Sequence, residues 1–336
     1  MPNEPMPVER RDFSAQELME RYPPRWDCPQ KQVIFARACP PGTVYDGVIA
    51  YSRWQAPPLP DAIATMLAPG RIVARPGFYS YAPEHELAGA FTWHVNFADP
   101  HLFGFYSTCL FAQDEIQVME HPALAALREA LLGAGLPAVT VEHGQPTPVL
   151  VAGAERRCAI RTHPNPAIGL PNGLYGRRNL VRASDEALRH ATQPLDPPTV
   201  TNVLAIAALS NGVGTYQREE IVYHLQTAHA GWRAAVLEAW RLRGERCPVV
   251  IHTGFWGCGA FGGNRVLMTL LQMLAAEAAG VDRLVIYTAD ASGPEAFAQA
   301  ERLLTEELAS AEPVATDYLI DCLLGLGFRW GRGTSD

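Results

Sequence analysis

Short continuous apolar runs alternate along the chain with segments in which apolar residues recur at helical spacing. This alternation predicts an α/β protein. The run CPVVIH at residues 247–252 has the length and composition of a buried strand. After Asn264, which is a natural N-cap, apolar residues recur every three or four positions and predict a helix. These helical positions are Val266, Leu267, Leu270, Leu271 and Leu274.

The same reasoning predicts further elements on both sides of this unit. TWHVNFA predicts a strand, LFAQDEIQVME a helix, and PALAALREALL a second helix that Pro122 opens. Further strands are predicted for AVTVEH, PVLVAGA, VTNVLAIAAL and RLVIYTA, and helices for residues 219–243 and the C-terminal part of the chain. This order of strands and helices is typical of a layered α/β fold.

Two segments lack this regularity. Residues 1–80 are rich in proline, with two short β-like runs, QVIFARA and GVIAYS, and predict an accessory N-terminal segment beside a main domain of residues 81–336. Residues 162–198 are polar and rich in Pro and Gly, which predicts a long loop over the functional site.

The turn between the strand at 247–252 and the following helix contains four glycines in seven residues. Glycines let backbone N–H groups approach an anion, and a helix N-terminus adds unpaired donors, so this turn is a candidate phosphate site. No Lys follows the glycines as in a Walker loop, and the spacing is not that of a dinucleotide fingerprint. A purely structural tight turn is the alternative interpretation.

Composition and charge narrow the function classes. A chain of 336 residues with 48% hydrophobic residues can bury a sizeable core. The net charge of −8 and scattered single Lys and Arg residues argue against a groove for nucleic acid or a patch for membrane surfaces. The N-terminus lacks the apolar core of a signal peptide and no segment has the length of a membrane span, so we expect a cytoplasmic protein, with signal-less secretion as the alternative.

Cysteines and histidines offer little independent chemistry. Seven cysteines without CxxC spacing predict reduced, mostly buried thiols. Cys258 has no evident His or Asn partner, so a cysteine nucleophile is not expected. His224 and His229 are five residues apart on one predicted helix, which does not suit a shared metal, and we expect no metal and no cofactor.

The identities of the residues in the glycine-rich turn are more specific than the spacing of its glycines. GFWGCGAFGGN closely resembles the GNWGCGAFGGD diphosphate loop of the poly(ADP-ribose) glycohydrolases, a branch of the macrodomain fold, and the flanking helices and strand are similar too. The resemblance implies a three-layer α/β/α sandwich with a mixed sheet, and a loop that binds the diphosphate of ADP-ribose. The residues it implies as substrate-binding are Thr253, Gly254, Gly257, Cys258, Gly259, Ala260, Phe261, Gly262 and Gly263.

A second block, VNFADPHLFGFYSTCLFAQDEIQ, resembles the VDFAN, GGG and QEE signature of the same family. The fourteen positions from Asp99 to Gln113 agree with the family pattern, so the register holds without a gap. The resemblance thereby implies ligand-binding roles for Asn96, Asp99, Gly104 and Gln113. Glu86, ten residues before Asn96, lies where the family has an acceptor for the adenine amino group.

The resemblance also implies the chemistry, which is cleavage of the glycosidic bond at the distal ribose through an oxocarbenium-like state. It makes Glu115 the general acid/base, while Asp114 and Asp99 hold ribose hydroxyls. Burial near Phe103, Phe105 and Phe261 would raise the pKa of Glu115. The alternative interpretations are helix-dipole electrostatics for Asp114 and Glu115, a turn role for Asp99 before Pro100, and core packing for the three Phe residues.

Three hypotheses follow: an ADP-ribosyl hydrolase, a non-catalytic ADP-ribose reader, and an unrelated α/β nucleotide enzyme. Phe103 and Phe105 replace two glycines of the family triplet, and we expect their bulk to make the site narrower. The chain is also acidic, and both features favour mono-ADP-ribose over the polymer. The sequence also resembles the bacterial effector-type branch, which implies arginine-linked ADP-ribose, with poly(ADP-ribose) as the alternative substrate. The expected partners are ADP-ribose and an ADP-ribosylated protein.

Overall fold

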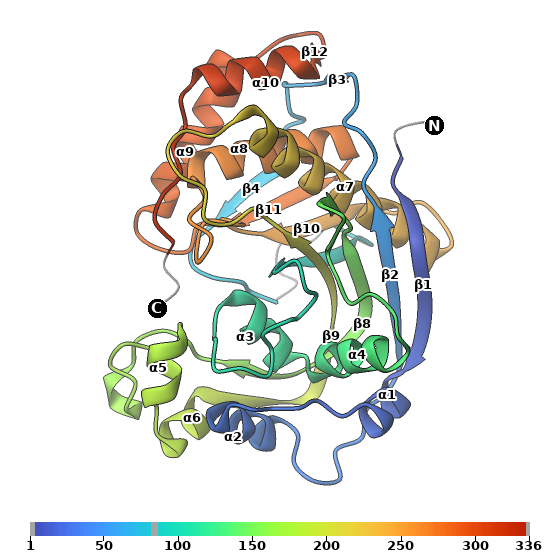
Figure 1. Ribbon diagram of the computed structural model, residues 1–336, viewed down its shortest axis with the longest axis vertical. Helices are drawn as coiled ribbons and strands as arrows, with labels where there is room; N and C mark the ends of the chain where they lie inside the picture. Colours follow the sequence, from blue (N-terminus) through green and yellow to red (C-terminus); the bar gives the residue numbers. More distant parts are fainter. Residues whose placement is uncertain (1–3, 82–86, 334–336) are drawn as a thin grey trace.

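The computed structural model describes residues 4–81 and 87–333, which form an eight-stranded mixed sheet between two layers of helices (Figure 1). The strand order is β1-β2-β8-β9-β5-β10-β11-β4. Strands β1, β2, β8 and β9 pair antiparallel, whereas β9, β5, β10, β11 and β4 pair parallel. The bounds are β1 (Met6–Ser14), β2 (Val48–Gln55), β4 (Ile72–Arg75), β5 (Phe91–Ala98), β8 (Val149–Ile160), β9 (Thr192–Ala207), β10 (Val249–Thr253) and β11 (Arg283–Tyr287).

Two hydrophobic clusters, one on each face of the sheet, hold the helical layers. One layer contains α7 (Arg218–Arg243), α8 (Arg265–Ala279), α9 (Gly293–Arg302) and α10 (Thr316–Gly325). The other contains α1 (Ala15–Arg21), α2 (Pro29–Ala38), α3 (Gln113–Glu120), α4 (Pro122–Gly133), α5 (Arg177–Arg182) and α6 (Asp185–Ala191). The predicted three-layer α/β/α arrangement with a mixed sheet is therefore confirmed.

Short elements complete the description. The strands β3 (Ala62–Ile63) and β12 (Val314–Ala315) pair with each other, as do β6 (Val141–Glu142) and β7 (Gln145–Pro146). A 3-10 turn, η1, spans Pro166–Ile168, and a π-helical turn, η2, spans Leu303–Glu307. None of the helices in the described ranges is long and apolar enough to cross a membrane.

Most predicted elements are present, but the prediction for QVIFARA was wrong because this run forms α2. Pro29 occupies the first turn of α2, and Lys31, Ile34 and Ala38 form its buried face at helical spacing. The predicted loop over residues 162–198 contains η1, α5, α6 and the beginning of β9. Residues 1–80 contribute β1 and β2 to one edge of the sheet and β4 to the other.

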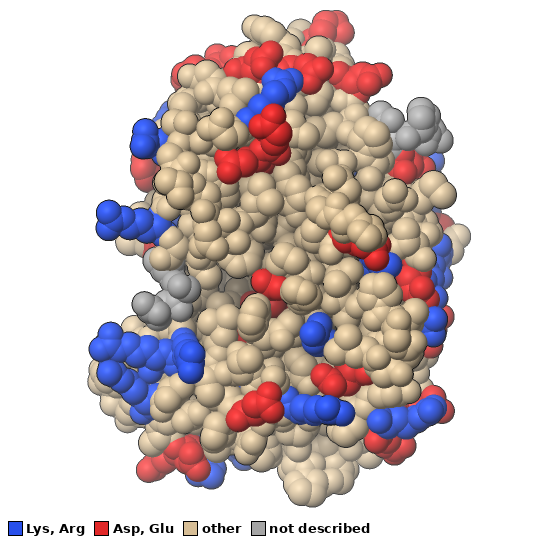
Figure 2. Space-filling model, in the orientation of Figure 1, with Lys and Arg blue, Asp and Glu red and all other residues tan. Residues whose placement is uncertain are grey.

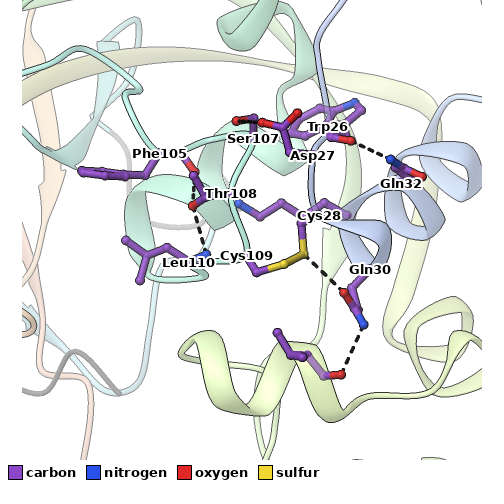
Figure 3. Close-up of a disulfide and its surroundings, with 12 residues drawn as sticks. Trp26, Asp27, Cys28, Gln30, Gln32, Phe105, Ser107, Thr108, Cys109 and Leu110 are labelled. Carbon is purple, nitrogen blue, oxygen red and sulfur yellow. Dashed lines mark hydrogen bonds between the residues drawn. A yellow bond between two sulfur atoms is a disulfide. The ribbon is translucent and has the colours of Figure 1, made fainter.

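The prediction that all cysteines are reduced was also wrong, because Cys28 and Cys109 form a disulfide. The two residues are 81 positions apart, and only the packing of α2 beside the loop before α3 brings them together (Figure 3). Cys39, Cys158, Cys247, Cys258 and Cys322 are free thiols.

The sheet topology places the two family-like blocks side by side. Strands β5 and β10 are parallel neighbours, so the residues that follow Ala98 and Thr253 leave the sheet at the same edge. The chain after β5 continues into α3 on one face, whereas the chain after β10 continues into α8 on the other face. When neighbouring parallel strands connect to helices on opposite faces of the sheet, a crevice forms at their carboxyl ends, and ligands of open α/β sheets bind there.

Candidate active site

The glycine-rich turn after β10 exposes unpaired backbone donors. Asn264 caps α8 by accepting hydrogen bonds from the N–H groups of Val266 and Leu267, both at 3.1 Å. Within the described residues, no hydrogen bond uses the backbone N–H of Gly257, Gly259, Ala260 or Phe261. Unpaired N–H groups beside a helix N-terminus form a binding site for an anion such as phosphate.

The shape of this turn depends on particular glycines. Gly257 has φ +76°, and a Cβ there would lie 2.7 Å from the Cβ of Ala208. The N–H of Gly263 donates to the carbonyl of Gly257 at 2.9 Å and closes the turn. At Gly259 a Cβ would have its nearest heavy atom at 3.7 Å, the Tyr175 hydroxyl, so this position has room for a side chain.

The C-terminal segment supports the turn from outside. The N–H of Gly331 donates to the carbonyl of Gly262 at 2.8 Å, and the Asn264 side chain donates to the carbonyl of Arg329 at 3.1 Å. Trp330 stacks on Tyr216 with ring centroids 4.3 Å apart. The described chain end thus fixes the outer side of the turn and leaves its inner side open.

A cleft of about 600 Å³ lies between the glycine-rich turn and the loop that links β5 to α3. Figure 2 shows acidic side chains in the hollow near the middle of this face. The lining residues are Phe97, Ala98, Asp99, Phe105, Leu110, Ala112, Gln113, Asp114, Glu115, Tyr175, Trp256, Gly257, Gly259, Ala260 and Phe261. The fold therefore brings the unpaired N–H groups and three of the predicted carboxylates into one cleft.

Asp114 and Glu115 occupy the first turn of α3, where both side chains can face the cleft. Asp114 is 6% exposed and Glu115 3% exposed. Glu115 accepts a hydrogen bond from the backbone N–H of Ala112 at 2.9 Å, and Asp114 accepts one from the side chain of Asn96 at 3.0 Å. Each carboxyl group is thus held in place by a hydrogen bond from a neighbouring residue.

Burial raises the pKa of both carboxyl groups. For Asp114, burial is the largest cause and the adjacent Glu115 carboxylate adds to it, while the hydrogen bond from Asn96 opposes it. For Glu115, burial is again the largest cause, opposed mainly by the positive charge of Lys31. Because the two groups interact, they titrate as a pair. Such a pair can hold a proton at a pH where exposed carboxylates are ionised, which suits proton transfer.

Asp99 and Gln113 line the same cleft but have structural partners. The Asp99 carboxylate accepts from the backbone N–H of His101 at 3.0 Å, so the predicted turn role is present beside a position in the lining. The Gln113 side chain accepts from the N–H of Phe97 at 2.7 Å and donates to the carbonyl of Val95 at 3.1 Å. Gln113 thereby attaches the start of α3 to the end of β5.

The two Phe residues of the family triplet differ in location. Phe103 is fully buried in the core beneath the loop, where its backbone has φ +52°. Phe105 is 43% exposed and lines the cleft, as does Phe261. The expectation that Phe103 adds bulk to the site was therefore wrong. The positive φ explains why a glycine suits this position in the family, and core burial offsets the strain of a phenylalanine there.

Several residues implied by the resemblance lie behind the cleft rather than in its lining. Asn96 is fully buried and donates to Asp114 and Gln117, and Thr253 is fully buried with its hydroxyl on Gln272. Glu86 lies outside the described residues. The others outside the lining are Gly104, Gly254, Cys258, Gly262 and Gly263. Burial raises the pKa of the Cys258 thiol, which agrees with its exclusion as a nucleophile.

A second pocket of about 800 Å³ adjoins the first and shares Phe97, Gln113 and Tyr175 with it. Its walls are aromatic, with Tyr79, Tyr81 and Tyr287, and Arg156 stacks over the Tyr81 ring at 4.1 Å. Sequence reasoning missed Tyr175 and the tyrosine cluster, because no local pattern marks them. The only local signal was the predicted position of residues 162–198 over the site.

No metal site is evident, since no group of three or more His, Cys, Asp or Glu side chains within residues 4–81 and 87–333 could hold an ion. The fold and the cleft define a class of protein, a three-layer α/β protein whose glycine-rich turn lies opposite buried carboxyl groups.

Comparison with protein families finds a match for part of the chain. Residues 179–295 match the model of the poly(ADP-ribose) glycohydrolase catalytic domain of macro domain fold. The matched region includes the glycine-rich turn, so the resemblance of this part of the chain to the family, stated from the sequence, is confirmed. The match does not extend to residues 95–117, so the roles of Asp114 and Glu115 stay predictions.

Solved structures give a more distant likeness. The poly(ADP-ribose) glycohydrolase from Thermomonospora curvata bound to the inhibitor ADP-HPD is 17% identical, with 87% of this chain and 84% of that chain covered and a TM-score of 0.40. The enzyme from Deinococcus radiodurans in complex with ADP-ribose is 12% identical, with 89% and 95% covered and a TM-score of 0.41. At this level of similarity the solved structures assign no role to any individual residue of this chain. The sequence has no match among curated proteins.

Proposed function

We propose that this protein hydrolyses the glycosidic bond between ADP-ribose and a modified protein side chain. The observation that carries the proposal is the single cleft in which the unpaired N–H groups of Gly257, Gly259, Ala260 and Phe261 face the buried carboxyl groups of Asp114 and Glu115. The diphosphate binds to the N–H groups, and the adenine enters the adjoining aromatic pocket. This orientation directs the distal ribose towards α3.

The carboxyl pair supplies the chemistry in this proposal. Glu115 donates a proton to the leaving group and then accepts one from the attacking water. Asp114 holds the ribose hydroxyls, together with Asp99. The developing positive charge on the ribose is stabilised by carboxylate oxygen atoms at close range.

The finer proposal is a preference for a single ADP-ribose, linked to arginine, over the polymer. Phe105 supports it, because its exposed ring narrows the cleft where the family has a glycine. The acidic net charge of −8 supports it as well, since a long polyanion gains no general attraction.

Poly(ADP-ribose) is the second candidate substrate, and the helix α5 favours it. Arg177, Arg178 and Arg182 are exposed on this helix and have no ion pair among the described residues. Figure 2 shows basic side chains gathered at the place of α5 in Figure 1. Tyr175, which lines both pockets, directly precedes this helix. Positive charge beside the cleft would attract the phosphates of further ADP-ribose units.

The experiment that tests the function measures ADP-ribose released from arginine-, serine-, aspartate- and polymer-linked substrates at equal concentrations of linkages, with calorimetric titration of free ADP-ribose in parallel. We expect release from at least one protein-linked substrate and faster release from mono-modified protein than from polymer. Binding of ADP-ribose without its release from any substrate would indicate a non-catalytic ADP-ribose-binding protein. Absence of both binding and release would overturn the proposal. Faster polymer turnover would overturn the finer preference alone.

A cytoplasmic location is also a proposal. A disulfide such as Cys28–Cys109 persists most readily in an oxidising environment, so the redox state of the pair in cells is informative. Thiol labelling of protein from intact cells should show reduced Cys28 and Cys109 if the protein acts in the cytoplasm, and fully oxidised cysteines would favour secretion.

A further inference from the structure

Lys31 is the only lysine in a chain that contains 27 Lys and Arg residues. Its side chain is fully buried on the inner face of α2, beneath the loop that leads into α3. Burial of an ammonium group costs several kcal/mol unless other charges and hydrogen bonds compensate it. The buried ammonium group of Lys31, next to the candidate site, therefore needs a physical explanation.

The contacts of Lys31 join it to the loop of the candidate site. Its Nζ donates a hydrogen bond to the backbone carbonyl of Tyr106 at 2.8 Å and lies 5.7 Å from the ring centroid of Phe111. Phe111 precedes Ala112, whose N–H binds the Glu115 carboxylate. Among the described residues, no carboxylate lies within ion-pair distance of Lys31.

The end of α2 is itself fixed to this loop, so Lys31 has a defined position. The N–H groups of Asp27 and Cys28 both donate to the carbonyl of Ser107, at 3.1 and 3.0 Å. The Ser107 hydroxyl donates to the Asp27 carboxylate at 2.7 Å, and the disulfide links Cys28 to Cys109 (Figure 3).

The charges that compensate Lys31 are those of the catalytic candidates. Burial lowers the pKa of Lys31 to about 8, and the carboxylates of Glu115 and Asp114 oppose this lowering. In return, Lys31 opposes the rise that burial causes in the pKa of both carboxyl groups. The other group that acts on both carboxyls is Asp99, which raises their pKa, and the Tyr175 hydroxyl also faces Glu115.

We infer that Lys31 is a positioning residue of the candidate active site, whose buried ammonium group holds the loop through the Tyr106 carbonyl and stabilises the ionised form of Glu115. Only the predicted effect of Lys31 on turnover rests on the proposed function; its effect on the carboxyl groups does not. Lys31 lines neither pocket, so it acts on the substrate through Glu115 and the loop. A lysine suits the role because its compact charge changes protonation readily when buried, whereas an arginine remains charged.

The first test needs no turnover. Protein labelled with isotopic lysine gives a single side-chain NMR signal, because Lys31 is the only lysine. Its titration midpoint should lie near 8 in the parent and move downward in Glu115→Gln and in Asp114→Asn, since each change removes a negative charge that favours the ammonium form. Glu129→Gln is the matched control, because Glu129 accepts from the Tyr106 hydroxyl but does not act on Lys31.

The second test uses turnover. In the pH dependence of the turnover rate, the apparent pKa assigned to Glu115 should rise by about one unit in Lys31→Met and in Lys31→Gln. It should stay near the parental value in Lys31→Arg. KM should change little, because Lys31 touches neither pocket. Arg128→Met is the control for loop packing, since Arg128 donates to the carbonyl of Leu102 in the same loop.

The outcomes separate this inference from the proposed function. An unchanged Lys31 midpoint in both carboxyl variants would overturn the inference even if the protein proves to be a hydrolase. Absence of turnover in the parent would overturn the proposed function and leave the NMR test intact. If Lys31→Met unfolds, the NMR titration of the carboxyl variants still decides, and an equal pH shift in Arg128→Met would count against Lys31.

Discussion

The residues that carry most of the proposed chemistry are the two buried carboxyl groups at the start of α3. Hydrogen bonds from Ala112 and Asn96 hold the two groups in place, and both groups line the cleft. Burial in the lining of the cleft thus separates these carboxyl groups from the exposed acidic residues of the chain.

Replacement of the acid/base group should remove turnover without removing binding. Glu115→Gln keeps the size of the side chain but cannot transfer a proton, so kcat should fall by about a hundredfold or more. The affinity for ADP-ribose, measured by calorimetry, should change by less than about tenfold, because the diphosphate contacts lie on the opposite wall. Near-parental turnover of this variant, with loss in Asp114→Asn or Asp99→Asn, would assign catalysis to another carboxylate.

The proposed anion-binding role of the turn has a similarly direct test at Gly259, where a Cβ has room and would lie 3.7 Å from its nearest heavy atom, the Tyr175 hydroxyl. Gly259→Glu should weaken ADP-ribose binding by at least about tenfold, because its carboxylate repels the diphosphate. Gly259→Gln is the matched control for size, and it should bind more tightly than the Glu variant. Equal affinity of the two variants would place the diphosphate elsewhere.

The raised pKa of Asp114 also predicts a cost in stability. Below the pKa of the unfolded state, near 4, the carboxyl group is neutral in both states and costs nothing. As the pH rises above this value, only the unfolded state ionises freely, so the free energy of unfolding decreases. Asp114→Asn should therefore raise the melting temperature at pH 7 by about 2 °C or more, with a smaller change at pH 4. A lower melting temperature at pH 7 would contradict this sign.

At the scale of elements, the loop between β5 and α3 depends on its attachment to α2. Both ends of the loop are fixed by secondary structure, and its centre is fixed by the disulfide, the Ser107 hydrogen bonds and Lys31. A loop that carries functional groups is thereby kept in one conformation.

Loss of the disulfide should destabilise the protein and loosen this loop. Because the linked residues are 81 positions apart, Cys28→Ser should lower the free energy of unfolding by about 2–4 kcal/mol. Denaturation of the parent with and without reductant should show the same difference. Cys247→Ser, at a free thiol, is the control, and it should keep the sensitivity to reductant that Cys28→Ser loses. A parent whose stability does not respond to reductant would contradict this expectation.

At the scale of the whole molecule, charge is distributed unevenly over an acidic protein. The arginines of α5 lie beside the cleft, although the sequence had predicted only scattered basic residues. Long-range attraction of this kind acts on an extended anion more than on a single nucleotide.

Reversal of this charge should therefore separate the two candidate substrates. Arg177→Glu combined with Arg178→Glu should reduce binding of polymer more than binding of free ADP-ribose, and the difference should shrink at high salt. The matched control is Arg21→Glu with Arg37→Glu, an equal charge change on exposed residues of α1 and α2. Equal losses in both double variants would show that only net charge matters.

The sequence alone predicted those features that depend on neighbouring residues. The apolar periodicity predicted β5, β10, β11, α7 and α8, and the glycines with the Asn264 cap predicted the turn that opens α8. Local patterns sufficed here because hydrogen bonding and capping act within a few residues.

The tertiary structure decided everything that depends on contacts distant in sequence. It paired Cys28 with Cys109, buried Phe103 instead of placing it in the cleft, and put Tyr175 between the two pockets. It also placed Lys31, which directly precedes the run QVIFARA that the sequence had predicted as β-like, near the carboxyl pair of α3. No local pattern contains these facts, because burial and electrostatic coupling arise only when separate elements pack against one another.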